Sequence, residues 1–185
     1  MSVKDIIEKR RAYRSIEPVE ITESIIDDLA NCASLAPSCF NNQPWRFVFV
    51  YGEKALEEFR AVLSEGNEWA HYASLYVVPF TKPELDCRIK GRDYDLFDTG
   101  MAFAFMMLRA TELGLVFHPI AGFDAEKTKK LLSIPDDMTV LTVAIIGKKM
   151  KELRPALNDK QKAAEQSRPE RLKQDKFIFR NKFND

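Results

Sequence analysis

Residues 93–113 constrain the fold of this chain more than any other segment. Their length and composition predict a helix, and Gly114 directly after them is typical of a helix end. Apolar side chains occupy every face of this helix: Leu96, Phe97, Met101, Phe103, Phe105, Met106, Met107, Leu108 and Leu113. A helix that is apolar all round is buried. We therefore expect residues 93–113 to lie inside the fold or in an interface between subunits.

The other periodic segments predict an α+β fold around this helix. Apolar residues at helical spacing, with Ser2, Thr22 and Asp124 as N-caps, predict further helices. These cover residues 3–10, 23–36, 53–64 and 124–133. Runs rich in aromatic and β-branched residues predict four strands. The strands are Trp45–Tyr51, Leu75–Phe80, Leu115–Ile120 and Thr139–Ile146.

The composition changes after Lys148. Residues 1–150 are expected to form the compact body, and residues 151–185 a C-terminal arm of the same domain. The arm is rich in charge and has few large apolar side chains until the run from Phe177 to Phe183. A segment of this composition does not build its own core. We therefore expect the arm to pack on a partner subunit.

Charge and cysteine content limit the class of protein. The 28 Lys and Arg residues balance 28 Asp and Glu residues, which leaves no general field for nucleic acid or an anionic membrane. The longest apolar run, Met101–Leu108, is far shorter than the ~18 residues of a membrane span. No apolar stretch near the start predicts a signal peptide. Cys32, Cys39 and Cys87 do not pair off evenly, which favours a reducing compartment. We expect a soluble, cytoplasmic protein.

Glycine and histidine content exclude several standard sites. No two of the seven glycines are closer than eight positions. The dinucleotide fingerprint GxGxxG, the P-loop and the GxSxG elbow all need closer spacing. With only His71 and His118 in the chain, no zinc cluster of histidines and cysteines is expected.

Arg10, Arg11 and Arg14 place three guanidinium groups within five residues. Guanidinium binds phosphate through paired, charge-assisted hydrogen bonds, so this cluster suits a phosphate monoester. The alternative is a solvated charge run that complements the end of the first helix.

Residues 37–44 form a polar loop bracketed by prolines. Ser38, Asn41, Asn42 and Gln43 both donate and accept hydrogen bonds, which suits the edge of a heterocycle. The same residues are also ordinary turn formers.

No pair of residues indicates acid–base catalysis. Asp98 and His118 lie in apolar segments and are interpreted as buried structural residues, and His71 is expected to pack among aromatic residues. Cys39 has no adjacent base, so nucleophilic catalysis through it is not expected.

Several motifs follow one another in a fixed order. Residues 10–14 are RRAYR, residues 33–47 are ASLAPSCFNNQPWRF, and residues 98–102 are DTGMA, with Gly122-Phe123 and Ile134-Pro135 further on. In this order they resemble the nitroreductase family of FMN-dependent oxidoreductases, over about residues 6–147. The PSCFNNQPW run is the specific part of the match.

The resemblance implies an α+β sandwich, in which helices flank a mostly antiparallel central sheet, built as an intertwined homodimer with FMN at the subunit interface. Carried over by position, it implies twelve cofactor-binding residues. These are Arg10, Arg11, Ala12, Arg14 and Arg171 near the phosphate, Pro37, Ser38, Cys39, Asn41 and Gln43 from the other subunit, and Ala121 and Gly122 beside the isoalloxazine ring. Ala12 and Cys39 stand where the family usually has serine.

The resemblance also implies an activity. Hydride would pass from NADH or NADPH through flavin N5 to a nitroaromatic, quinone or similar acceptor by a ping-pong mechanism, without a titrating side chain or a metal. Two alternatives stay open: a flavin-binding dimer without turnover, and a relative that fragments flavin or reductively dehalogenates an aromatic substrate. Such relatives use a lid, for which residues 81–92 are short.

Overall fold

The computed structural model describes residues 2–183 and has the predicted α+β architecture. Its helices are α1 (Val3–Lys9), α2 (Glu23–Ser34), α3 (Glu53–Phe59), α4 (Asp95–Glu112), α5 (Ala125–Leu132) and α6 (Asp159–Gln166). Its strands are β1 (Ile16–Glu17), β2 (Arg46–Tyr51), β3 (Leu75–Thr81), β4 (Arg88–Ile89), β5 (Arg92–Asp93), β6 (Leu115–Ile120), β7 (Thr139–Val140) and β8 (Val143–Lys149). The caps predicted from Ser2, Thr22 and Asp124 all form.

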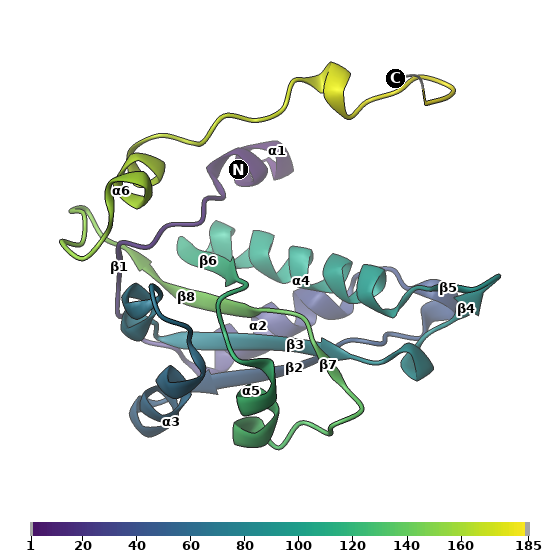
Figure 1. The fold of residues 1–185 in the computed structure, drawn as a ribbon, viewed down its shortest axis with the longest axis horizontal. Helices are drawn as coiled ribbons and strands as arrows, with labels where there is room; N and C mark the ends of the chain where they lie inside the picture. The colour runs from purple at the N-terminus through teal and green to yellow at the C-terminus, as the bar shows by residue number, and fades with distance from the viewer. Residues whose placement is uncertain (1, 184–185) are drawn as a thin grey trace.

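A six-stranded sheet organises the molecule, and every strand pair described in it is antiparallel. Successive side chains of a strand face opposite sides of a sheet. Tyr76 and Val78 of β3 accordingly enter one core, and Leu75 and Val77 enter the other. Figure 1 shows α4 on one side of the sheet and α3 and α5 on the other. The result is a three-layer sandwich with two cores.

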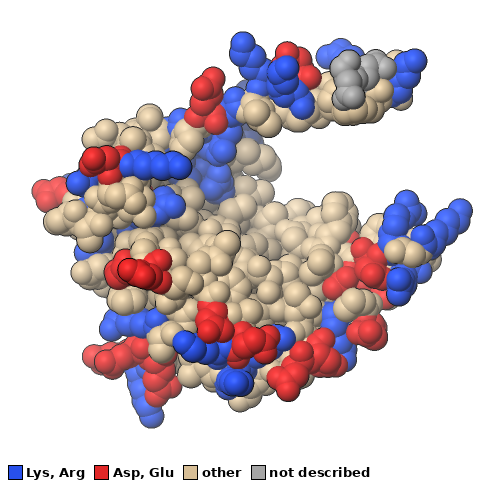
Figure 2. All heavy atoms as spheres, in the orientation of Figure 1, with Lys and Arg blue, Asp and Glu red and all other residues tan. Residues whose placement is uncertain are grey.

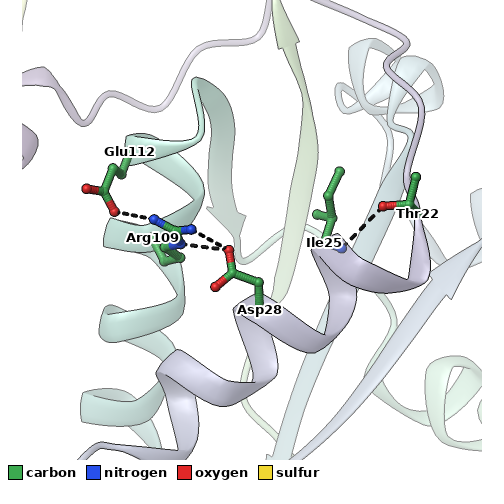
Figure 3. Close-up of polar contacts among 5 residues, drawn as sticks. All are labelled: Thr22, Ile25, Asp28, Arg109 and Glu112. Atoms are coloured by element: carbon green, nitrogen blue, oxygen red, sulfur yellow. Dashed lines mark hydrogen bonds and ion pairs between the residues drawn. The ribbon is translucent and has the colours of Figure 1, made fainter.

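A charged contact fixes α2 beside α4. Arg109 donates from Nε to the Asp28 carboxylate at 2.7 Å and from Nη1 to Glu112 at 2.6 Å (Figure 3). Thr22 begins α2 by accepting the N–H of Ile25 at 3.3 Å. The side chains of the charged contact are about one-third exposed, so its contribution to stability is modest.

The fold of the single chain buries only one face of α4, so burial of its other faces in an interface between subunits stays a prediction. Ala102, Phe103 and Met106 pack into the core beneath the helix. On the opposite side Leu96 and Phe97 are 52% and 66% exposed. Figure 2 shows that the surface over α4 carries few charged side chains. The sequence therefore predicted the apolar character of α4. The fold of one chain covers only one face of this helix.

Several boundaries also differ from prediction. The single strand expected at 139–146 is two strands, β7 and β8, which both pair with β3. The helix expected at 53–64 ends at Phe59 and continues as a single tight turn. The short β4–β5 hairpin occurs where a loop was expected, and it turns at Lys90-Gly91, both with positive φ.

The C-terminal arm contains one helix that the sequence analysis missed, α6. Beyond it the chain leaves the body and passes above α1 (Figure 1). Leu172, Phe177 and Phe183 are more than half exposed there. No helix among residues 2–183 is long and apolar enough to cross a membrane.

Candidate functional site

The arginines near the N-terminus meet the C-terminal arm. A pocket of about 290 Å³ is lined by Arg10, Arg11, Ala12 and Arg14 together with Ala164, Arg168, Pro169 and Arg171. Figure 2 shows Lys and Arg side chains gathered in the hollow between the arm and the body. We call this the arginine pocket. All five residues predicted near a phosphate lie in it, and Arg168 joins them.

Glu165 of α6 holds the arginine segment in place. Its carboxylate accepts the backbone N–H groups of Arg14 and Ser15 at 2.6 and 3.2 Å. Although charged, Glu165 is only 5% exposed. Arg168 donates to the backbone carbonyl of Arg10 at 2.9 Å, which ties the arm to the end of α1. Sequence reasoning missed Glu165 and Arg168, because neither belongs to a local motif.

The charge of the arginine pocket suits an anion. Burial lowers the pKa of Arg10, and the charges of Arg168, Arg171 and Arg11 lower it further. Glu165 brings one negative charge near five guanidinium groups, so it offsets the surrounding positive charge only in part. A phosphate monoester would satisfy these guanidinium donors with charge-assisted hydrogen bonds. The residues present therefore fit the phosphate end of FMN.

The alternative role for the arginines is to complement the end of the first helix, but Arg11 complements the end of α6 instead. Its guanidinium donates to the carbonyls of Ala164 and Glu165, in the last turn of α6. Cations are favourable at this end of a helix. Arg10 and Arg14 make no such bond among the described residues. They are therefore the members of the N-terminal cluster best placed for a ligand.

The 37–44 loop is rigidly held at a different place. Asp98 of α4, 2% exposed, accepts the N–H of Cys39 at 2.7 Å, as expected for a buried structural carboxylate. Ser38 Oγ accepts the N–H of Gln43 at 3.0 Å. Phe40, Asn41 and Gln43 all have positive φ, at 49°, 61° and 52°. Such conformations cost free energy in residues other than glycine and persist only where neighbouring contacts impose them.

Two of the three cysteines are paired, and this pair was not predicted from the sequence. Cys39 in the loop and Cys87 before β4 form a disulfide, with their Cα atoms 6.0 Å apart. Only Cys32 is free. Next to this disulfide, Asp86 Oδ1 accepts the backbone N–H of Cys87 at 2.8 Å. The two cysteines are 48 positions apart, so no local sequence pattern predicts the bond. The bonded sulfurs also leave no thiolate there for a metal ion.

Gly122 lies close to Asn67 of the same chain. In the structure, an added Cβ would collide with the side-chain amide of Asn67. That amide donates to the Gly122 carbonyl at 3.0 Å. A larger residue at position 122 would therefore require the Asn67 side chain to move. The binding role predicted for Ala121 and Gly122 stays a prediction.

The arginine pocket and the 37–44 loop lie at opposite ends of α4. Cys39 is bonded to Asp98 in the first turn of the helix. Arg11 lines a small pocket with Thr111 and Gly114 at the other end. At a rise of 1.5 Å per residue, Asp98 and Thr111 are about 20 Å apart along the axis. One chain therefore does not bring its two predicted groups of binding residues to the same place.

His118 is a core residue, as the sequence predicted. It is 5% exposed, stacks on Trp69 with ring centroids 4.7 Å apart, and lies with Nδ1 3.0 Å from the carbonyl oxygen of Tyr13. Burial lowers the pKa of His118 to about 4, from an ordinary value of 6.5, and the charges of Arg14 and Arg10 act in the same direction. The neutral ring can donate its Nδ1 proton to the Tyr13 carbonyl.

This environment predicts a pH-dependent stability. The unfolded chain takes up a proton at His118 below about pH 6.5, whereas the folded chain resists it until about pH 4. The free energy of unfolding should therefore have its highest value above pH 6.5. It should fall by roughly 3 kcal/mol as the pH drops to 4. Urea unfolding of the wild type and His118→Gln across this range checks it. His71→Gln should keep most of the dependence, and an unchanged slope in His118→Gln would contradict the prediction.

Comparison with known proteins identifies the family and the fold. The model of the nitroreductase family matches residues 7–148, most of the chain. This chain belongs to the nitroreductase family. It is thus an oxidoreductase, and the resemblance of its RRAYR and PSCFNNQPW segments is confirmed.

Curated relatives agree with this family, and a solved structure agrees with the fold. MhqN of Bacillus subtilis, provisionally named an NAD(P)H nitroreductase, is 25% identical over 181 residues, which cover 80% of this chain and 88% of that protein. A similarly named Archaeoglobus fulgidus protein is 25% identical, over 93% of this chain and 97% of its own. A crystal structure described as an oxidoreductase containing FMN superposes with a TM-score of 0.86 at 24% identity, over 100% of this chain and 94% of that one.

Proposed function

We propose that this nitroreductase-family protein is a homodimeric FMN enzyme that passes hydride from NADH or NADPH to a nitroaromatic, quinone or similar acceptor by a ping-pong mechanism. The observation that carries the proposal is the arginine pocket. Five guanidinium groups from two distant parts of the chain converge there on about 290 Å³. Relatives whose names or descriptions include NAD(P)H or FMN agree with it.

The residues have separate tasks in this proposal. Arg10, Arg14 and Arg171 hold the phosphate, and Arg168 ties the arm to the end of α1 beside them. Glu165 positions the Arg14 backbone and is thus a positioning residue. The 37–44 loop of the second copy contacts the flavin, with Pro37, Ser38, Cys39, Asn41 and Gln43 as the candidates. This division follows from the separation of the loop and the pocket along α4.

The exposed apolar surfaces support the homodimer. Leu96, Phe97 and Phe105 of α4 are 41–66% exposed in the single chain. A Cβ added to Gly100, on the same helix, would meet no atom within 4 Å. A second copy packed on α4 would cover these side chains and bring its 37–44 loop toward the first copy's arginine pocket. The arm, with Phe177 and Phe183 exposed, is proposed to pack on that partner. We also propose a cytoplasmic location, consistent with the balanced charge.

The chemistry needs little acid–base help from the protein. FMN, when bound, supplies the hydride carrier. The chain supplies position and charge through the arginine pocket and the rigid loop. Asp98 and His118 are both buried and bonded to backbone groups, so neither is arranged as a proton donor to a ligand.

A colour assay tests the proposal. The purified protein should carry the yellow absorption of oxidised flavin, and anaerobic addition of NADH or NADPH should bleach it. Steady-state rates at varied donor and acceptor concentrations should give the parallel double-reciprocal lines of a ping-pong reaction. Bound flavin that neither nucleotide bleaches would favour the flavin-binding protein without turnover. Absence of FMN binding would refute the proposal altogether.

A further inference from the structure

We propose that the Cys39–Cys87 disulfide is a thiol-sensitive clamp on the 37–44 loop, and that a dithiol reductant opens the clamp and weakens FMN binding. The inference rests on the proposed function for its effect on FMN, whereas the clamp itself is a property of this chain. It assigns a regulatory modification site to two cysteines that have no role in the hydride transfer.

The first argument is the position of the bond. Cys39 lies in the middle of the loop, and Cys87 lies at the base of the β4–β5 hairpin. A second contact joins the same two segments, because Asn42 Nδ2 donates to Asp86 Oδ1 at 3.3 Å. That contact is exposed and long, so it is weak by itself. The covalent bond is therefore the main link between the loop and the hairpin.

The second argument is the conformation that the bond holds. Phe40 and Asn41, directly after Cys39, both have positive φ, and Phe40 is 82% exposed with no core contact to fix it. The constraints on this segment act at Cys39, through the disulfide and through Asp98. Opening the disulfide leaves the bond from Cys39 N–H to Asp98 as the tie to α4, together with hydrogen bonds within the loop itself. The loop then has more conformations available, and only a fraction of them are competent to bind.

The third argument is accessibility and compartment. Cys39 and Cys87 are half-buried, near exposed neighbours such as Phe40 and Arg88, so a small dithiol can reach the bond. In a reducing compartment, which we propose for this protein, disulfides are usually transient and redox-sensing rather than structural. A bond that joins two surface segments suits that use.

The reaction balances as a thiol–disulfide exchange. A thiolate of the dithiol attacks one sulfur of the Cys39–Cys87 bond, giving a mixed disulfide and releasing the other cysteine as a thiolate that takes a proton. The second thiol of the reagent then attacks the mixed disulfide and releases the remaining cysteine. Two cysteine thiols form, and the dithiol is oxidised to its disulfide.

The experiment measures FMN affinity in both redox states. Apo-protein is oxidised with glutathione disulfide or reduced with dithiothreitol, and FMN is titrated by flavin fluorescence. If the loop is competent to bind FMN for only a fraction of the time, the apparent Kd equals the intrinsic Kd divided by that fraction. We expect a rise of about tenfold on reduction. Cys87→Ser should have the higher Kd in either state, whereas Cys32→Ser, which removes the free cysteine, should respond as the wild type does.

A second measurement is independent of FMN. The amides of Asn41 and Asn42 donate to the carbonyls of Ser38 and Cys39, each at 3.0 Å. Their hydrogen exchange should become at least about tenfold faster on reduction, as expected for local opening. Equal FMN Kd values in the oxidised and reduced states would overturn the inference. So would a digest of the oxidised protein without a disulfide-linked peptide that contains Cys39 and Cys87. If neither state binds FMN, the proposed function fails, and unchanged exchange of these amides would then overturn the clamp as well.

Discussion

A protein in which Phe97 is replaced by glutamate is expected to be a folded monomer that retains no FMN. Phe97 is 66% exposed on α4, in the face that we propose a second copy covers. A carboxylate buried in such an apolar interface costs several kcal/mol, and a symmetric dimer would bury it twice. The dimer dissociation constant should therefore rise at least about a thousandfold.

The helix itself should tolerate this change. Residue 97 lies in the first turn of α4, where a negative charge is favourable to the helix dipole. The circular dichroism spectrum of Phe97→Glu should thus match that of the wild type. Its molar mass from light scattering should be half that of the wild type. Leu131→Glu, at an exposed position on α5, is the matched control and should stay dimeric with flavin bound. A dimeric Phe97→Glu protein would contradict the proposed interface.

Replacing Arg14 by alanine should remove most of the preference for FMN over riboflavin. The two ligands differ by the phosphate, so their affinity ratio isolates what the arginine pocket contributes. A charge-assisted hydrogen bond is worth about 1.5–3 kcal/mol, and a guanidinium can form two to one phosphate. The FMN Kd should accordingly rise at least about a hundredfold, with little change for riboflavin.

Two further variants sharpen this comparison. Arg14→Lys keeps the charge but loses the paired geometry, so its FMN Kd should fall between those of the wild type and Arg14→Ala. Arg60→Ala removes the same charge at an arginine outside the arginine pocket and should leave the FMN-to-riboflavin ratio unchanged. Equal losses for FMN and riboflavin in Arg14→Ala would mean that the residue supports the fold and not the phosphate.

The parts of the fold that sequence predicted well depend on local interactions. Ser2, Thr22 and Asp124 cap their helices through hydrogen bonds to backbone groups three residues on. Gly114 ends α4 with φ +80°. Such contacts need only a few neighbouring residues, so the pattern predicts them without knowledge of the tertiary structure.

The parts that were missed depend on partners far along the chain. α6 is short and polar, and its place is secured by Glu165, which bonds to Arg14 and Ser15 some 150 positions earlier. The cysteine pairing bridges 48 positions. No periodicity or spacing predicts contacts of this kind, because they arise only after the sheet has brought the segments together.

By itself, the sequence determined the family motifs, the caps and the guanidinium-rich segment, because each is a property of adjacent residues. Tertiary structure alone decided that Arg168 joins that segment, that Cys39 and Cys87 bond, and that the 37–44 loop lies at the far end of α4 from the arginine pocket. The physical reason is that convergence of distant side chains depends on packing, which buries one face of α4 and leaves the other face open.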